Sequence, residues 1–468
     1  MQWKWNGGPS TAGPRHDDAV SSDLLHTSIV VPAVLVPVDV VALVLVLWAL
    51  VGPARRRRSG DVGRGGGLRA VLVRLVALVV GAGIGLGLVW WFGDVQDAFG
   101  VAFTPVTRMW VAFAFAAVAM LVVVLVQGGT GRRVVALVGA LAVVLATALG
   151  INVDFGAYRT IGQVITPNPY LVGDLGHEHV ATAGAQVVDP ADWHAPASMP
   201  RHGETISMRI PAKVSHFHAR EAVVWLPPAA RVADPPTLPV LVALSGQPGQ
   251  PADMFQTGGL GRLLDRYAAA HHGLAPIVVA PDQLGAPARN PMCVDSQQLG
   301  KSATYVMTDT VDWIRGHLDV GAGPDAWGIT GFSQGATCAM QFSTAHPEVF
   351  GTALAISSEL APVNGSQQNT VQVGFHGSET AYRAATPVAI MARNAPYRDH
   401  LAVFGYGQDD APYAASTKTL RAAAERAGMS TAEIVSPGSA HDWNTVRYVL
   451  AHGMPTVLTH LGLPGGDR

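Results

Sequence analysis

The chain divides into two parts by the pattern of its hydrophobic and polar positions. Residues 27–151 are almost free of acidic side chains and contain four long apolar runs, whereas residues 152–468 mix apolar and polar positions as globular domains do. The runs cover 29–51, 70–92, 109–126 and 134–151. Because a helix needs about 20 apolar residues to cross a bilayer core, we predict four transmembrane helices over 27–151.

The N-terminal 26 residues are rich in Gly, Ser, Pro and Asp and are predicted to be disordered. Translation could begin further along the chain. Residues 152–203 hold no long periodic segment, so we predict that they form an extracytoplasmic tether between the helices and the rest of the chain.

Basic residues set the predicted orientation of the helices. The first loop carries the run Arg55–Arg58 and the third carries Arg132 and Arg133, whereas the second holds Arg108 beside two aspartates. Since Lys and Arg favour the cytoplasmic side, the first and third loops should lie inside. We therefore expect a multi-pass protein of the cell membrane, with the lipid bilayer as a partner and everything after residue 151 outside.

Polar and small residues within the apolar runs have separate interpretations. Arg74 lies near the cytoplasmic end of the second run and is expected to snorkel to the interface. Asp39, in the middle of the first run, could be neutral, paired across the bundle, or catalytic or transport-related, since intramembrane charges are rare. Overlapping small-xxx-small spacings predict close helix packing. They are formed by Gly81, Gly83, Gly85 and Gly87.

From residue 204 onward, short apolar runs alternate with helix-like segments. The strand-like runs are 221–226, 238–244, 275–280, 327–330, 352–357 and 400–406. The helix-like segments are 258–271, 302–318, 333–345 and 414–428. Alternating strands and helices predict an α/β domain over 204–468, with a mostly parallel sheet flanked by helices.

Charge and cysteine content narrow the function classes. The formal net charge is −2, so nothing points to nucleic-acid binding. The chain has two cysteines, and both fall in the part expected outside, where disulfides form. Cys293 follows the 275–280 strand, and Cys338 lies on the 333–345 helix. We predict a disulfide between them; two buried free thiols are the alternative.

One motif dictates chemistry directly. The segment Gly331-Phe-Ser-Gln-Gly335 follows a strand-like run and opens a helix-like one. This is the setting of a nucleophile elbow, which exposes its central serine, here Ser333, at a sharp turn. A serine hydroxyl is a weak nucleophile, so it needs a histidine to take its proton and a carboxylate to orient that histidine.

Candidates for both partners follow strand-like runs further along the chain. His441 comes after residues 432–436, and Asp409 and Asp410 come after 400–406. We favour Asp410, with Asp409 as the alternative acid. The order Ser, Asp, His is that of the α/β-hydrolases. Ligands bind beyond the carboxyl ends of parallel strands, so all three side chains should meet at that edge of the sheet.

The reaction also needs two N–H donors for the oxyanion. One should be the backbone N–H of Gln334, the residue after the nucleophile. The second should come from the loop after strand 238–244, where Pro248 lacks an N–H and Gln247 is the best candidate. Apolar side chains nearby could shape an ester pocket or belong to the core. They are Met254, Phe255 and Trp443.

Metal binding has little support in the sequence. His216 and His218 flank Phe217 and would share one face of a strand. Two histidines are too few ligands to argue a metal site, so no metal is predicted.

Taken together, these segments resemble the actinobacterial membrane-anchored members of the putative esterase family. The resemblance rests on Leu244-Ser-Gly-Gln-Pro-Gly249, Asn290-Pro-Met-Cys-Val-Asp-Ser296, Gly331-Phe-Ser-Gln-Gly-Ala-Thr-Cys338, His441-Asp-Trp443 and the joining segment Ile151-Asn-Val-Asp-Phe-Gly-Ala-Tyr158. That family includes antigen 85 mycolyltransferases, enterochelin esterases and S-formylglutathione hydrolase. Over about 204–462, the resemblance implies an α/β-hydrolase fold, a triad at the positions above and no cofactor.

One departure from the pattern bears on the substrate. The antigen 85 branch carries Leu-Asp-Gly before its oxyanion loop, with the Asp serving trehalose, and this chain has Ser245 there. The leading hypothesis is therefore a membrane-anchored serine esterase that hydrolyses carboxylic esters, lipid or soluble, at the outer face of the membrane. An acyltransferase of the cell envelope would share the same acyl-enzyme. A non-catalytic membrane sensor or scaffold is the third interpretation.

Overall fold

The computed structural model describes residues 25, 27–51, 65–96, 103–166, 168–173, 175 and 186–465. They belong to two compact units, one made of 1–87, 109–153 and 158–169 and the other of 88–108, 154–157 and 170–468. Apart from Leu25, the N-terminal segment predicted to be disordered lies outside the described residues, and so do Arg55–Arg58.

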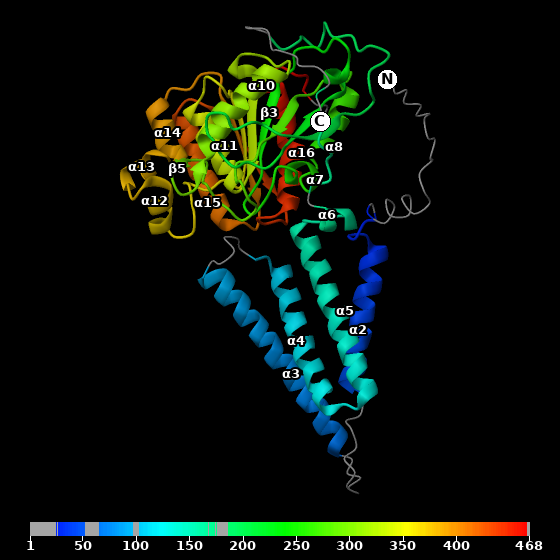
Figure 1. The fold of residues 1–468 in the computed structure, drawn as a ribbon. Helices are drawn as coiled ribbons and strands as arrows, with labels where there is room; N and C mark the ends of the chain where they lie inside the picture. Colours follow the sequence, from blue (N-terminus) through cyan, green and yellow to red (C-terminus); the bar gives the residue numbers. More distant parts are fainter. Residues whose placement is uncertain are drawn as a thin grey trace, which may run out of the picture. The chain divides into compact units, whose positions relative to one another are not determined.

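Long apolar helices make up most of the first unit (Figure 1). They are α2 (Pro32–Val51), α3 (Gly65–Val89), α4 (Pro105–Gln127) and α5 (Thr130–Phe155). Among the described residues, these are the four helices long and apolar enough to cross a membrane, as the hydrophobic runs predict. Large apolar side chains such as Val79 and Leu141 are exposed on them. Helices that are apolar all round suit a membrane.

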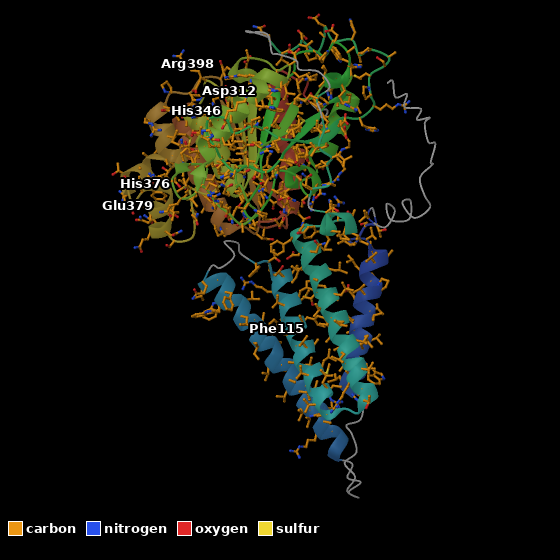
Figure 2. The ribbon with its side chains drawn as sticks, in the orientation of Figure 1. Phe115, Asp312, His346, His376, Glu379 and Arg398 are labelled. Atoms are coloured by element: carbon orange, nitrogen blue, oxygen red, sulfur yellow. A yellow bond between two sulfur atoms is a disulfide. The ribbon has the colours of Figure 1, made fainter. Side chains whose placement is uncertain are left out.

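Glycines let α3 and α4 approach closely. A Cβ at Gly81 would lie 2.4 Å from the carbonyl oxygen of Phe115, and a Cβ at Gly85 would lie 3.0 Å from the Cβ of the same residue, which is labelled in Figure 2. At Gly83 and Gly87 a Cβ would meet nothing within 4 Å. The predicted close packing is therefore confirmed for one of the two overlapping spacings, since residues four apart share a helix face.

The guanidinium of Arg74, which the sequence predicts to snorkel to the interface, reaches the last turn of α2. The side chain is fully buried, and its Nη1 donates a hydrogen bond to the carbonyl oxygen of Leu50 at 2.9 Å. Arg132 of α5 donates in the same way to Ala49 at 2.8 Å. Both carbonyls lie in the last turn of α2, where the helix itself has no N–H groups left to satisfy them. The two arginines therefore cap a helix.

Asp39 gains no such explanation. It lies partly buried on α2, and its carboxylate makes no ion pair or hydrogen bond within the described part of the chain. The structure therefore leaves its catalytic or transport role as a prediction.

The second unit is built on an eight-stranded sheet in the order β1-β2-β4-β3-β7-β8-β9-β10. Its strands are β1 (Glu204–Met208), β2 (Ala222–Leu226), β3 (Val240–Leu244), β4 (Ile277–Ala280), β7 (Trp327–Phe332), β8 (Thr352–Ile356), β9 (Leu401–Gly407) and β10 (Ser430–Ser436). All pairings from β4 to β10 are parallel, whereas β2 pairs antiparallel with β1 and β4. A separate ribbon joins β5 (Asp295–Ser296) to β6 (Gly300–Lys301).

Helices cover both faces of this sheet (Figure 1). One group comprises α8 (Leu260–Ala270) and α16 (Trp443–His460), and the other comprises α11 (Gln334–Ala345), α14 (Pro387–Asn394) and α15 (Ala411–Arg426). The central strands are buried on both sides, which is why they read as continuous apolar runs. The predicted α/β-hydrolase fold is confirmed.

Shorter helices occur in both units, α6 in the first and the others in the second. They are α6 (Ile161–Ile165), η2 (Pro228–Arg231), α7 (Asp253–Gln256), α9 (Ser302–Thr304), η3 (Tyr305–Thr310), α10 (Val311–His317), η4 (Pro324–Ala326), α12 (Gln367–Phe375) and α13 (Glu379–Ala384). A π-helical turn, η1 (Trp90–Val95), follows α3. The segment 302–318, expected as one helix, is continuous but changes to π-helical geometry over η3.

Two regions differ from the pattern expected from sequence. The sequence did not predict helices α12–α14, which lie between β8 and β9. Exposed polar side chains occur in this region, such as His376 and Glu379 (Figure 2). Part of the segment expected to act as a tether lies along β1. There Ser207 donates its N–H to the carbonyl of Leu171 at 2.9 Å, and Gly173 donates to Ser207 at 3.1 Å.

Candidate active site

The turn at Ser333 has the geometry of a nucleophile elbow. Ser333 joins β7 to α11 with φ 56° and ψ −120°. A non-glycine residue rarely adopts such a backbone, and rare conformations of this kind concentrate at functional sites. Its N–H donates to the carbonyl oxygen of Ile356 at 2.8 Å, so the end of β8 holds the turn in place.

The flanking glycines are required by space. A Cβ at Gly331 would lie 2.2 Å from the carbonyl oxygen of Gly335, and one at Gly335 would lie 2.3 Å from that of Ser245. Both distances are far shorter than an ordinary contact, so the strand and the helix can approach only because these side chains are missing.

Three predicted residues meet at this turn. His441 Nε2 lies 2.9 Å from Ser333 Oγ, and His441 Nδ1 lies 3.2 Å from Asp410 Oδ2. Ser333 and His441 are each 7% exposed, and Asp410 is fully buried. A hydroxyl, an imidazole and a carboxylate in this chain of contacts can pass a proton from the serine to the histidine while the carboxylate orients the ring.

The structure distinguishes the two candidate acids. Asp410 points to the imidazole, whereas the side chain of Asp409 is exposed and only its backbone N–H is engaged, with the carbonyl oxygen of Ser439 at 2.9 Å. A Cβ at Gly407 would lie 2.3 Å from the carbonyl oxygen of Ala440. The acid-bearing and histidine-bearing loops are therefore pressed together, backbone against backbone.

Asp442, which sequence reasoning did not single out as a site residue, fixes the histidine loop. Its carboxylate accepts the N–H of Thr445 at 2.8 Å, as the N-cap of α16, and also accepts the N–H of Ala440 at 2.8 Å. Burial raises the pKa of Asp442, although these N–H donors act in the opposite direction. An Asp at the start of an apolar helix is an N-cap signal that could have identified it.

Aromatic rings surround the imidazole. The ring centroids of Tyr413 and His441 are 4.1 Å apart, and those of Phe332 and His441 are 4.8 Å apart. Trp443 packs on Phe332 at 5.3 Å. Of the apolar residues proposed for an ester pocket, Trp443 thus lies in the aromatic group beside the site, whereas Met254 and Phe255 are buried in the hydrophobic core.

The two predicted oxyanion donors lie on neighbouring segments, Gln247 in the loop after β3 and Gln334 at the start of α11, where Gly335 packs against Ser245. Within the described residues, neither the backbone N–H of Gln247 nor that of Gln334 donates a hydrogen bond to protein. The side chain of Gln247 is turned aside, because its Nε2 donates to the carbonyl oxygen of Ala288 at 2.9 Å. Two backbone donors without acceptors, beside a nucleophile, are the parts from which an oxyanion hole is made.

The predicted disulfide between Cys293 and Cys338 is present, so the alternative of two free thiols is wrong. It links residues 45 apart in sequence and fastens the loop after β4 to the nucleophile helix. Gln334 Nε2 lies 3.8 Å from Cys293 Sγ, directly behind the elbow.

A partly buried carboxylate beside helix α11, Glu359, also escaped sequence reasoning. The Thr337 hydroxyl lies 2.9 Å from Glu359 Oε2 and 3.2 Å from the carbonyl oxygen of Ser333. Burial raises the pKa of Glu359 to about 7, although the hydrogen bond from Thr337 lowers it. No motif marks this residue, because its proximity to the site depends on where β8 ends.

Possible metal ligands are not grouped among the residues that the structure describes. His216 and His218 are exposed on a loop. Across the described ranges, no three His, Cys, Asp or Glu side chains come together in a way that could hold an ion.

A parallel sheet with a serine elbow at its carboxyl edge is the framework of an α/β-fold hydrolase. Residues 218–446 match the putative esterase family. An uncharacterized protein of Corynebacterium glutamicum is 31% identical over 366 residues, which cover 77% of this chain and 84% of that protein. The chain belongs to the putative esterase family and is an ester hydrolase by class.

Solved structures that resemble part of this chain include a ferulic acid esterase and an S-formylglutathione hydrolase. A ferulic acid esterase is 17% identical, with a TM-score of 0.47, and the match covers 55% of this chain and 98% of that one. The S-formylglutathione hydrolase of Agrobacterium tumefaciens is also 17% identical, with a TM-score of 0.45, covering 55% of this chain and 95% of that one.

Proposed function

We propose that this protein is a membrane-anchored serine esterase that cleaves carboxylic esters through an acyl-enzyme on Ser333, at the outer face of the membrane. The observation that carries the proposal is the unbroken chain of contacts from Ser333 Oγ through His441 to Asp410, with distances of 2.9 Å and 3.2 Å. A serine in an elbow, within reach of an oriented imidazole, is the arrangement of an activated nucleophile.

The first half of the reaction forms the acyl-enzyme. Ser333 Oγ attacks the ester carbonyl carbon while its proton passes to His441 Nε2, and the imidazolium is stabilised by Asp410. The carbonyl oxygen becomes an oxyanion that the N–H groups of Gln247 and Gln334 receive. When the tetrahedral intermediate collapses, the C–O bond to the alcohol breaks and His441 Nε2 returns the proton to that alcohol.

The second half releases the acid. Water replaces the alcohol, gives its proton to His441 Nε2 and attacks the acyl carbon. Collapse breaks the bond to Ser333 Oγ, which takes the proton back. None of these steps uses a cofactor.

The proposal is tested by Ser333→Ala in the full-length protein in detergent. Loss of the nucleophile costs on the order of 10⁶-fold in kcat in well-studied triads, so turnover of a p-nitrophenyl ester and labelling by a fluorophosphonate probe should both disappear. Ser343→Ala is the matched control, since this buried serine lies on the same helix α11 and its hydroxyl has no partner among the described residues. Activity within tenfold of wild type in Ser333→Ala would refute the assignment.

The same protein distinguishes the alternatives. If the acyl group passes to an added alcohol in preference to water, the enzyme is an acyltransferase that uses the same triad. If the wild type fails to react with the probe, the serine is not activated and a non-catalytic sensor or scaffold becomes the better interpretation.

The predicted side of the membrane needs its own test. Protease added to intact protoplasts should remove the part of the chain after residue 151, and a cysteine introduced by Ser59→Cys should resist impermeant thiol reagents. Background labelling should be low, because Cys293 and Cys338 are joined. Protection of the hydrolase domain from protease would reverse the orientation without affecting the triad.

A further inference from the structure

Gln283 lies between the two segments that carry the predicted oxyanion donors, the loop after β3 and the first turn of α11. It follows β4 by three residues and is fully buried. Its side-chain Nε2 donates to the carbonyl oxygen of Ser245 at 2.7 Å and lies 3.2 Å from Oε1 of Gln334. Ser245 begins the loop that carries Gln247, so one amide nitrogen bridges both halves of the site.

The backbone around Gln283 is held rigidly. The Ser302 hydroxyl donates to the carbonyl oxygen of Gln283 at 2.7 Å. The preceding residue, Asp282, pairs with Arg220 at 2.6 Å, and Arg220 Nη2 also donates to the carbonyl oxygen of Gly249 at 3.0 Å. The oxyanion loop is therefore held at both ends: Gln283 donates to it at Ser245, and Arg220, which pairs with Asp282, donates to it at Gly249.

Within the part of the chain that the structure describes, only the nitrogen of the Gln283 side-chain amide forms hydrogen bonds. The amide oxygen Oε1 is buried and, among the described residues, accepts no hydrogen bond. A buried polar atom without a partner is destabilising, and a leucine of similar volume would avoid that cost. The value of a glutamine at this position therefore lies in its two N–H groups, which point to Ser245 and Gln334.

We propose that Gln283 is a positioning residue for the oxyanion hole: its amide nitrogen fixes the spacing between the backbone N–H groups of Gln247 and Gln334. The inference rests on the proposed function. Donors stabilise an oxyanion strongly only when they are already aimed at its place before the reaction begins, and small displacements cost rate. A bridge between the loop after β3 and the first turn of α11 holds both donors in that orientation.

The test compares Gln283→Leu with Gln341→Leu in the full-length protein in detergent. Gln341 is also a buried glutamine with an unpaired Oε1 among the described residues, and it lies away from the elbow on α11. Since deleting one oxyanion donor outright costs about 10²–10³-fold, misplacing one should lower kcat by about 10- to 100-fold. KM should stay within about threefold, as expected for an interaction made in the transition state.

A second readout separates positioning from general destabilisation. A boronic acid forms a tetrahedral adduct with the serine, so its inhibition constant should rise in Gln283→Leu in proportion to the loss in kcat. Neither quantity should change in Gln341→Leu. A kcat within twofold of wild type in folded Gln283→Leu, or an unchanged boronate affinity, would overturn the bridge.

A further variant covers the case in which Gln283→Leu fails to fold. Gln334→Leu removes the Oε1 acceptor and keeps the backbone N–H, so it breaks one arm of the bridge and should lower kcat by roughly 3- to 10-fold. An unchanged kcat there would refute the bridge. These outcomes are distinct from failure of the proposed function, which would show instead as activity retained by Ser333→Ala.

Discussion

The imidazole of His441 is stacked on the ring of Tyr413, with centroids 4.1 Å apart and planes inclined by 30°. Tyr413 lies in the first turn of α15, the helix that Asp410 precedes as its N-cap residue. The same helix start therefore supplies both the carboxylate that holds Nδ1 and an aromatic surface against the ring. The contact with Asp410 positions the imidazole within its own plane, and the stack on Tyr413 limits movement perpendicular to that plane.

Removing that surface should slow the reaction moderately. An aromatic pair contributes about 0.5–1.5 kcal/mol beyond its buried area, so Tyr413→Leu should lower kcat/KM by roughly 2- to 13-fold, and Tyr413→Phe should change it little. Tyr448→Leu is the matched control, because Tyr448 stacks on His452 at 3.9 Å outside the site. Equal activities in Tyr413→Leu and Tyr448→Leu would show that the stack does not assist His441.

The two neighbouring carboxylates should respond very differently to substitution. Asp410→Asn keeps the size of the side chain but favours the wrong tautomer of His441, and the equivalent change in a well-studied triad lowers kcat by about 10⁴-fold. Asp409→Asn alters an exposed side chain, so kcat should stay within about twofold, since surface substitutions of this kind are close to neutral. Steady-state kinetics on both variants check this, and the reverse order would transfer the role to Asp409.

The elements that meet at the site could be predicted because their signals are local. The elbow glycines, the apolar central strands and the strand–carboxylate sequence before α15 each follow from a few adjacent residues. Such signals placed Ser333, His441 and Asp410 at one edge of the sheet, where the structure brings them into contact.

The remaining features depend on contacts between distant residues. Arg74 is buried because the last turn of α2 presents unsatisfied carbonyls to it, and Gln283 bridges two loops through atoms 38 and 51 positions away in sequence. Helix α13 has no buried residue, and α12 buries only the short face formed by Thr370, Val371, Gly374 and Phe375, so neither carries the long apolar face that marks a helix. Their serine N-caps, Ser366 and Ser378, were the available signal.

Glu359 should give the stability of the protein a measurable pH dependence. Its pKa is raised from an ordinary value of 4.5 to about 7, so the folded state keeps a proton that the unfolded state releases over this range. The stabilisation is fully present below the ordinary pKa and is lost as the pH rises through about 7. In Glu359→Gln this loss should be absent, so its melting temperature should fall less than that of wild type between pH 5 and 8.

The control for that experiment is Glu221→Gln, which changes an exposed glutamate of the same unit. Melting curves of the full-length proteins in one detergent, recorded across the pH series, provide the comparison. Parallel pH profiles for wild type and Glu359→Gln would mean that the carboxyl of Glu359 is ionised throughout.

The disulfide should contribute strongly to stability because of the length of chain that it closes. Cys293 and Cys338 are 45 positions apart, and closing a loop of that length stabilises by ~4 kcal/mol on the chain-entropy estimate. Cys293→Ser and Cys338→Ser should lower the melting temperature by similar amounts, and the double variant should be no worse than either, since all three lose the same bond.

Loss of the Cys293–Cys338 disulfide should also lower the thermal stability of the activity. The disulfide fastens the loop after β4 to the nucleophile helix, and Gln334 lies against Cys293 Sγ, so its loss frees a loop beside Ser333. We expect both single variants to lose activity at lower temperature than wild type. Alkylation followed by mass spectrometry on protein isolated without reductant should find neither thiol free. Two alkylated cysteines would show that the bond does not form in the native compartment, and would also weaken the argument that this part of the chain lies outside.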